Sequence, residues 1–434
     1  MPRPLLSFVG DDFTGSTDAV EVLELAGVRT VLFTRPPTPE QLQQHPDAQA
    51  FGVATVARLL PPDAMASLLR PTFSAIREFG APFLHYKVCS TFDSSPSIGS
   101  IGRALDVGVD VCRTACVPVV VGAPSLGRYC AFGNLFVRNR NDTEPLRLDR
   151  HPSMSRHPVT PMHEADLRLH LAWQTNSKIG LFDVTQFDGG RESQRAAYAA
   201  IRATHDAVLI DLVHERDLAA VGALLVGDRA ARGTTFVVGS SGVESALCAY
   251  WSESGTIAPT SVAAAAREAI PCLDPILVVC GSCSPVALRQ VQCAMDHGFS
   301  AVEGSTEPSR LDEAVSRVVA SLASGKDVVL HTEGTRDAAT TAPQEAAVGR
   351  ALGQIVRRVL EQRPVRRVVI AGGDTSGAVA STLGVESMRL AATLVRGAPL
   401  MRVTALGSPA DGIEMVFKGG QVGATDFFIR AAGR

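Results

Sequence analysis

What the sequence lacks excludes several classes of protein. The chain of 434 residues has no apolar run near the roughly 18 to 20 residues that span a bilayer, and its first ten residues lack the basic start and long apolar core of a signal peptide. Its net charge is −3, without a dense block of Lys and Arg, and only 5% of its residues are aromatic, so it lacks the charge and stacking surfaces that nucleic acids require. We therefore expect a cytoplasmic protein whose partner is neither a membrane nor a nucleic acid.

Standard nucleotide and metal signatures are missing too. There is no GxxxxGK[ST], and no GxGxxG directly after a strand with an acidic residue about 20 positions later, which disfavours a Walker ATPase and a Rossmann dehydrogenase. Most of the nine cysteines lie inside apolar runs, as small core residues do in a reducing compartment. Cys280 and Cys283 form a CxxC, but no second pair stands at zinc spacing.

The patterns that are present predict an α/β protein. Short apolar runs alternate with helical patterns of about 10 to 15 residues, as in a doubly wound sheet, and 434 residues exceed one ordinary core. The alternation weakens between 251 and 275 and then restarts. We predict two domains, each a mainly parallel sheet flanked by helices, with the active site in the interdomain cleft. The predicted parts are a substrate-binding domain (1–250), a crossing (251–275) and a nucleotide-binding domain (276–434).

The segment LLSFVGDDFTGSTDAVEVLELAG, residues 5–27, places two carboxylates at the end of a strand. An apolar run stops at Gly10, Asp11 and Asp12 follow, and an amphipathic helix comes next, which Asp18 and Glu21 are suited to cap. Ligands of open α/β sheets bind at the carboxyl ends of strands, where such a pair can hold a hydroxyl, a metal or a proton in transit. Two solvated turn aspartates that cap the helix would give the same pattern.

Three glycine-bearing loops in the second half are candidates for phosphate binding. They span residues 281–285, 372–377 and 418–423, each follows an apolar run, and the first two open helices. Backbone N–H groups at a helix N-terminus bind phosphate oxygens, and glycine allows their close approach. One such loop is often only a turn, but three in one domain favour a nucleotide site.

In the first half, polar residues at strand ends favour an anionic ligand. Lys87 leads into the polar residues 89–95, Arg128 follows a strand, and residues 156–162 precede a helical pattern. Arg engages carboxylates in pairs of hydrogen bonds, and Ser and Thr pair with sugar hydroxyls, so these segments suit a small hydroxyl-rich acid. Solvated loop charges are the alternative.

These segments together resemble a known family. GDDFTG, YKVCSTFDSSPSIGSIG, SLGRYCAFGNLFV and HPVTPM are similar to the N-terminal domain of the four-carbon acid sugar kinases, and GSCSP, IAGGDTSG and KGGQVG to their C-terminal nucleotide-binding domain. The resemblance implies ATP-dependent phosphorylation of a terminal hydroxyl on a small sugar acid such as erythronate, threonate, 3-oxo-tetronate or 3-oxo-isoapionate. Cys89 before Ser90 and Thr91 resembles the 3-oxo-tetronate branch, and GQVG replaces a GNFG-like ending.

The resemblance also implies roles for single residues. The sugar-acid side comprises Asp11, Asp12, Lys87, Ser90, Thr91, Asp93, Arg128 and His157. The ATP side comprises Ser282, Ser284, Gly372, Gly373, Asp374, Thr375, Gly419 and Gly420. Asp12 would orient or deprotonate the hydroxyl, while Lys87 and Arg128 fix the substrate carboxylate. Asp374 is the competing base, or it holds Mg²⁺ through water. ATP and Mg²⁺ are the expected cofactors, the metal ligands are unassigned, and a homo-oligomer is allowed.

Two other functions remain open from the residues. A sugar-acid sensor would bind its ligand without chemistry and need not bind MgATP. A metal-dependent dehydratase or aldolase would use Asp11 and Asp12 as ligands and act without ATP, although the sequence lacks a His-rich ligand set to support it.

Overall fold

The computed structural model describes residues 3–138, 144–157, 159–227, 233–258, 270–273, 275–332 and 342–434. By its contacts the chain divides into two compact units. Unit 1 comprises Met1–Asp11, Val22–Thr30 and Arg35–Thr260, and unit 2 comprises Asp12–Glu21, Val31–Thr34 and Ser261–Arg434. Much of the predicted crossing at 251–275 lies outside the described residues, which omit 259–269 and 274.

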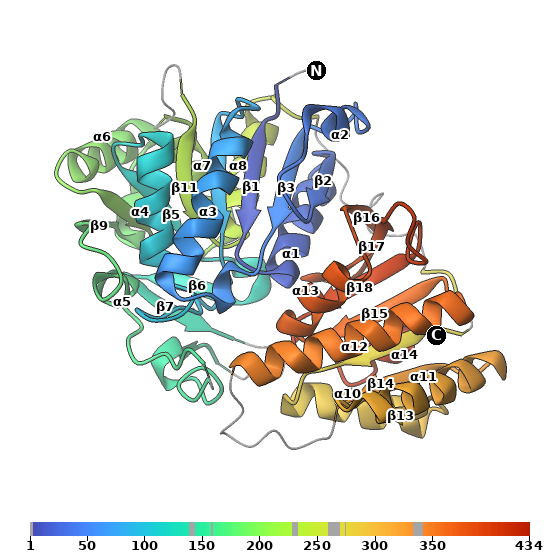
Figure 1. Cartoon of the computed structure of the whole chain (residues 1–434). Coiled ribbons are helices and arrows are strands. Elements are labelled where there is room, and N and C mark those ends of the chain that lie inside the picture. The colour runs from blue at the N-terminus through green and yellow to red at the C-terminus, as the bar shows by residue number, and fades with distance from the viewer. Residues whose placement is uncertain are drawn as a thin grey trace. The chain divides into compact units, whose positions relative to one another are not determined.

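Unit 1 is built on a parallel sheet whose two faces are covered by helices (Figure 1). The strand order is β3(Ala50–Ala54), β1(Leu6–Gly10), β4(Phe83–Lys87), β11(Thr235–Gly239), β5(Val117–Val120), β10(Ala207–Ile210), β9(Ile179–Phe182). Every pairing between these neighbours is parallel. A small antiparallel sheet comprises β6(Arg128–Ala131), β7(Asn134–Val137) and β8(Leu146–Arg147).

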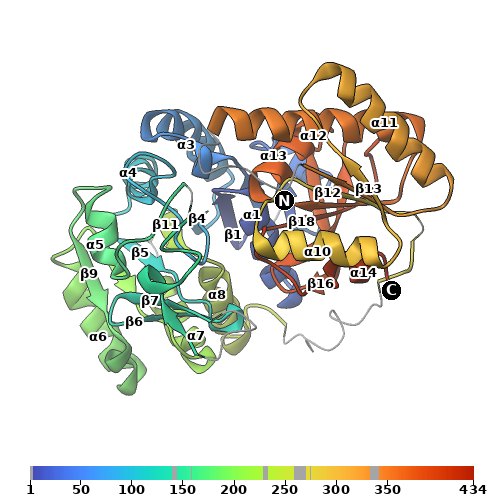
Figure 2. The ribbon, with the colours of Figure 1, turned by 90° about the horizontal axis from the view of Figure 1, so that it is seen from below.

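The helices of unit 1 lie in two layers. They are α2(Pro39–Gln43), α3(Pro62–Arg77), α4(Ile101–Cys112), α5(Leu167–Ala172), α6(Arg191–Arg202), α7(Leu218–Gly227) and α8(Gly242–Glu253). Helices α3 and α4 cover one face of the sheet, and α7 and α8 cover the other (Figures 1 and 2). The central strands are buried along their whole length, as the two covered faces of a doubly wound sheet require.

Unit 2 has a mixed sheet. Its order is β13(Ser300–Glu303), β14(Val328–His331), β12(Leu277–Cys280), β15(Arg367–Ala371), β18(Glu414–Lys418), β17(Ala398–Thr404), β16(Ser387–Val395), β2(Thr30–Phe33). The first five strands pair in parallel, and the remaining pairings are antiparallel. The prediction of two α/β parts with mainly parallel sheets is therefore confirmed.

The helices of unit 2 also flank the sheet. They include α10(Pro285–Asp296), α11(Pro308–Ala323), α12(Ala342–Gln362), α13(Gly373–Thr382) and α14(Phe427–Ala431). Figure 2 shows α12 and α13 on one side of the strands and α10 and α14 on the other. Buried side chains of β12, β15 and β18 join those of α10 and α14 in one apolar core. No helix within the described ranges is both long and apolar enough to cross a membrane.

Two details of the predicted elements needed correction. Helix α1(Phe13–Leu25) begins directly after the paired aspartates, so Asp18 and Glu21 are interior residues and do not cap it. Strand β3 was not predicted, because its sequence AFGVA is short and contains Gly52. A β-carbon at Gly52 would lie 2.1 Å from the ring of Phe8, so glycine is required for the neighbouring strand to pack.

Candidate functional site

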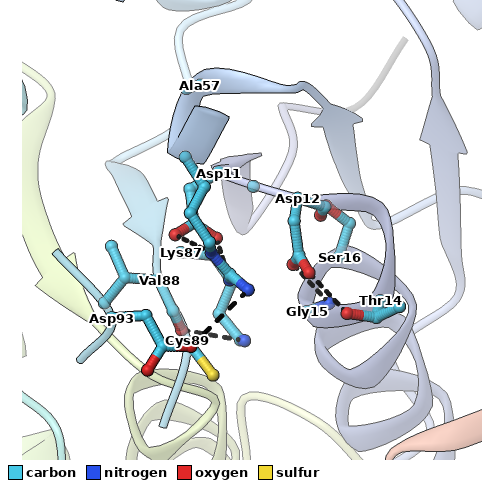
Figure 3. Close-up of polar contacts among 12 residues, drawn as sticks. Asp11, Asp12, Thr14, Gly15, Ser16, Ala57, Lys87, Val88, Cys89 and Asp93 are labelled. Carbon is cyan, nitrogen blue, oxygen red and sulfur yellow. Dashed lines mark hydrogen bonds and ion pairs between the residues drawn. The ribbon is translucent and has the colours of Figure 1, made fainter. Parts of the chain in front are cut away.

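The two consecutive aspartates after β1 turn in different directions (Figure 3). The backbone N–H of Asp11 donates to the carbonyl of Lys87 at 2.9 Å and extends the ladder between β1 and β4. Asp12 caps α1, since its Oδ1 accepts from the N–H of Gly15 at 2.7 Å and its Oδ2 from the hydroxyl of Thr14 at 2.5 Å. Both carboxylates are buried, so the alternative of two solvated turn residues is wrong, although Asp12 does cap the helix.

Arg58 holds Asp11 in a bidentate ion pair that the sequence did not predict. Its Nε and Nη2 donate to the Asp11 carboxylate at 2.9 and 2.7 Å, and its Nη1 lies 4.0 Å from Oδ2 of Asp93. Arg58 follows β3, and β3 pairs with β1, so topology brings a residue 47 positions away to the same sheet edge. A polar TVAR segment after an apolar run is the signal that could have identified it.

Lys87 ends β4 and is buried beside these groups in unit 1. Its Nζ donates to the carbonyl of Val88 at 3.1 Å. In the loop that follows, the thiol of Cys89 and the hydroxyl of Thr91 are 2.9 Å apart. Asp11, Arg58, Lys87 and the start of this loop thus form a charged, largely buried group, which is suited to an anionic ligand with hydroxyls.

The rest of that loop is held in an unusual conformation. Phe92 is fully buried with φ at +56°, a left-handed backbone that a non-glycine residue adopts only when its surroundings impose it. The hydroxyl of Ser94 donates to the carbonyl of Phe92 at 3.0 Å and lies 2.9 Å from Nε2 of His170 on α5. Burial lowers the pKa of His170 to about 4, so the imidazole is neutral at pH 7.

Two of the predicted substrate residues, Arg128 and His157, form hydrogen bonds within the loops that contain them. One guanidinium nitrogen of Arg128, at the start of β6, donates to the carbonyl of Leu126 at 2.6 Å. His157 lies in the segment before α5, where its Nδ1 accepts from the N–H of Thr160 at 3.1 Å. The structure therefore groups Asp11, Lys87 and Asp93 through their contacts, and it places His157 in a separate hydrogen-bonded turn.

In unit 2, the three glycine loops meet at one edge of the sheet. They follow β12, β15 and β18, which are consecutive neighbours in the strand order. The N–H of Gly281 donates to the carbonyl of Ala371 at 3.1 Å, and the N–H of Gly372 donates to that of Lys418 at 2.9 Å. Parallel pairing thus aligns the three loops, as a shared phosphate site requires.

The first and third loops pack closely against each other at Gly420. A β-carbon on Gly420 would lie 2.2 Å from the hydroxyl oxygen of Ser282. Ser284 caps α10 by accepting from the N–H of Ala287 at 3.0 Å, and its hydroxyl donates to the carbonyl of Gly420 at 2.6 Å. The predicted residues Ser282, Ser284 and Gly420 are therefore in direct contact.

The second loop opens α13. Gly372 has φ at +125°, which favours glycine, and its carbonyl accepts from the N–H and the hydroxyl of Ser376 at 2.9 and 2.7 Å. Thr375 is buried, and its hydroxyl would lie 2.1 Å from a β-carbon on Gly281. Asp374 lies in the first turn of the helix, where N–H groups have no partner within the helix itself.

Asp12 belongs by its contacts to unit 2 and lies beside this helix start. Its Oδ2 is 3.6 Å from the position that a β-carbon on Gly373 would take, and among the described residues it is the one atom within 4 Å of that position outside the neighbouring residues and backbone of α13. A carboxylate thus lies within van der Waals distance of the place that a side chain at the start of α13 would occupy. This arrangement combines a proton acceptor with an anion-binding helix end.

Comparison with known proteins finds family matches in both parts of the chain. Residues 6–247 match the family described as a sugar-binding N-terminal domain, and residues 277–428 match the one described as a nucleotide-binding C-terminal domain. Two solved structures share the fold: one of a Salmonella typhimurium LT2 protein (TM-score 0.74, 24% identity, 98% of each chain) and one of Haemophilus influenzae protein HI1011 (TM-score 0.68, 22% identity, 98% of this chain and 99% of that one).

Two curated relatives align along almost the whole chain. A 3-oxo-isoapionate kinase of Paraburkholderia graminis is 43% identical over 98% of this chain and 93% of its own. A 3-oxo-tetronate kinase of Methylobacterium radiotolerans is 32% identical over 98% of both chains.

Proposed function

The chain belongs to the family whose members join a sugar-binding N-terminal domain to a nucleotide-binding C-terminal domain, and we propose that it uses ATP to phosphorylate a terminal hydroxyl of a small sugar acid. The resemblance to four-carbon acid sugar kinases is thereby confirmed, and the aligned relatives are kinases of such acids. In this proposal residues 1–250 bind mainly the sugar acid and residues 276–434 mainly the nucleotide, with 251–275 as the crossing.

The observation that carries the proposal is the position of Asp12 beside Gly373. Phosphoryl transfer depends on positioning and charge stabilisation, with a carboxylate to orient the attacking hydroxyl or accept its proton. The first turn of α13 offers N–H groups to the phosphate oxygens, and Asp12 stands where the hydroxyl must approach. Asp12 is therefore the proposed base, and Asp374 in that first turn is the competing candidate.

Mg²⁺ fits the donor set of this helix start. Magnesium keeps several waters and binds through one or two carboxylates together with substrate phosphates. Within the described ranges no group of three or more His, Cys, Asp and Glu side chains is arranged to hold an ion. Asp374, or Asp12 if it is not the base, would hold it, and the bound ion would neutralise charge on the transferred phosphoryl group.

On the sugar side, Arg58 and Lys87 provide the positive charge for the substrate carboxylate. Asp11 fixes the orientation of Arg58, and the hydroxyls of Ser90 and Thr91 are proposed to bind those of the sugar. The higher identity to the 3-oxo-isoapionate kinase, 43% against 32% for the 3-oxo-tetronate kinase, favours a branched 3-oxo acid as the acceptor.

ADP release measured against a panel of acids tests the proposal. The panel contains 3-oxo-isoapionate, 3-oxo-tetronate, erythronate and threonate, each with MgATP and each without it. We expect turnover only with MgATP, and highest kcat/KM with 3-oxo-isoapionate. Conversion of an acid without ATP would instead support a dehydratase or aldolase. Binding of an acid by a protein that binds no MgATP would support a sensor.

A further inference from the structure

The chain buries a lysine behind the three glycine loops of unit 2. Lys418 is the last residue of β18, is fully buried, and precedes Gly419 and Gly420. Its backbone carbonyl accepts from the N–H of Gly372, so its main chain supports the loop that opens α13. The sequence has four lysines, and the two that end central strands, Lys87 and Lys418, are both buried.

Within the described part of the chain, the ammonium group of Lys418 has aromatic neighbours but no carboxylate in hydrogen-bond range. Its Nζ lies 5.4 and 5.8 Å from the ring centroids of Phe427 and Phe428 on α14. Among the residues that the structure describes, no hydrogen-bond acceptor contacts Nζ. Cation–π contacts offset only part of the desolvation of an ammonium, and a buried charge without a counter-charge is strongly unfavourable. Such a group is stable only where something else compensates its charge.

The groups around Lys418 leave its charge uncompensated. Cys280 at the end of β12 is the titratable group that acts on it, and it favours the charged form. On α10 the buried polar side chain is Gln290, whose amide donates to the carbonyls of residues 422–424 at 2.9 to 3.1 Å. The charges at α14, Asp426 and Arg430, pair with each other at 2.8 Å. Burial lowers the pKa of Lys418 to about 8.

We propose that Lys418 is a positioning residue for the nucleotide: its ammonium compensates the phosphate charge from behind the glycine loops, and nucleotide binding supplies the counter-charge that this buried cation lacks. The inference rests on the proposed function, and it predicts that nucleotide binding is coupled to proton uptake. Near pH 8 about half of the Lys418 side chains are neutral in the free protein. A polyphosphate nearby favours the charged form, so binding draws one proton onto Nζ in those molecules.

Calorimetric titration with MgADP in two buffers of different ionisation enthalpy measures this proton directly. We expect uptake of roughly half a proton per nucleotide at pH 8 and almost none at pH 6, because Lys418 is already charged at pH 6. Lys418→Met should abolish the uptake and weaken MgADP binding on the order of tenfold at pH 7. Lys326→Met, at an exposed lysine in the turn before β14, is the matched control and should behave as the wild type.

Thermal melting separates this role from a structural one. Removal of an uncompensated charge should leave Lys418→Met as stable as the wild type or more stable, whereas a residue needed only for packing would lower the melting temperature. If the wild type binds MgADP without proton uptake at pH 8, the inference falls and the kinase proposal stands. That measurement needs no variant. If the wild type binds no MgADP or MgATP at all, both fall.

Discussion

Oδ2 of Asp12 lies 3.6 Å from the point where a β-carbon on Gly373 would be. Asp12 lies between β1 and α1, and Gly373 is the first residue of α13. The start of α13 lies on one side of this space, and the Asp12 carboxylate lies on the other. We therefore expect an added methyl group in this space to lower activity more than it lowers stability.

Gly373→Ala tests the use of that space. Gly373 lies inside α13 without a positive φ, and the new methyl meets no atom closer than 3.6 Å, so we expect a melting temperature near that of the wild type. The methyl would occupy the approach to the first N–H groups of the helix, and kcat/KM for ATP should fall at least tenfold. Normal ATP kinetics in a folded Gly373→Ala protein would contradict the assignment of this space to phosphate.

Gly281→Ala adds the same methyl group at a position where Thr375 leaves too little room for it. The new β-carbon would stand 2.1 Å from the hydroxyl oxygen of Thr375, so the loop or α13 must move. We expect destabilisation of about 1 to 3 kcal/mol, measured by urea unfolding, in contrast to Gly373→Ala. Equal stability of the two variants would show that packing between these loops is loose.

Asp12→Asn and Asp374→Asn separate the two candidate bases. If Asp12 orients or deprotonates the hydroxyl, Asp12→Asn should lower kcat by about 10² or more while MgATP binding is kept, since the amide is nearly isosteric. Asp374→Asn should mainly weaken the binding of MgATP. Turnover and nucleotide affinity are measured on both variants at saturating sugar acid. Near-normal turnover of Asp12→Asn would transfer the role to Asp374.

Arg58→Lys tests the sugar-acid side. Lysine keeps the charge but cannot reproduce the two hydrogen bonds from Nε and Nη2 to Asp11. We expect KM for the sugar acid to rise about tenfold, while KM for ATP changes little. Arg70→Lys is the control, because Arg70 is exposed and its pair with Asp110 lies on the surface. A rise in KM for ATP alone would remove Arg58 from the substrate site.

Glu21 gives unit 2 a pH-dependent stability. It is buried on α1, accepts from the N–H of Gly397 at 2.7 Å, and burial raises its pKa from 4.5 to about 7. The folded protein therefore binds a proton more tightly there than the unfolded chain, and this contribution to stability is lost as the pH rises from 4.5 to 7. The resulting cost of the buried charge, up to about 3 kcal/mol, persists above pH 7.

Glu21→Gln should remove that cost, because the amide oxygen still accepts from Gly397 and carries no charge. We expect the variant to melt at a higher temperature than the wild type at pH 8, with a difference that shrinks toward zero as the pH falls to 4.5. Melting temperatures are compared at intervals of half a pH unit. A constant difference across that range would show that Glu21 keeps its ordinary titration.

The parts of the site that the sequence predicted are local. Each glycine loop follows its own strand, and strand ends of a parallel sheet share an edge, so residues 281–285, 372–377 and 418–423 could be grouped before any coordinates were known. The sequence did not identify Arg58 as the partner of Asp11, because Arg58 reaches Asp11 only through the pairing of β1 with β3, which was not predicted. Likewise, a lysine at a strand end gives no sign that it is buried, since most lysines are exposed.

The assignment of residues 12–21 and 31–34 to unit 2 has a consequence for the history of the gene. Strand β2 pairs with β16, and the N–H of Thr34 donates to the carbonyl of Glu386 at 3.1 Å, so the sheet of unit 2 includes a strand that lies far from its other strands in the sequence. Each unit combines segments that are separated in the sequence, so neither half of the chain can be exchanged by itself. Recombination or engineering that transplants the carboxyl-terminal half of one such kinase into another must also carry residues 12–34.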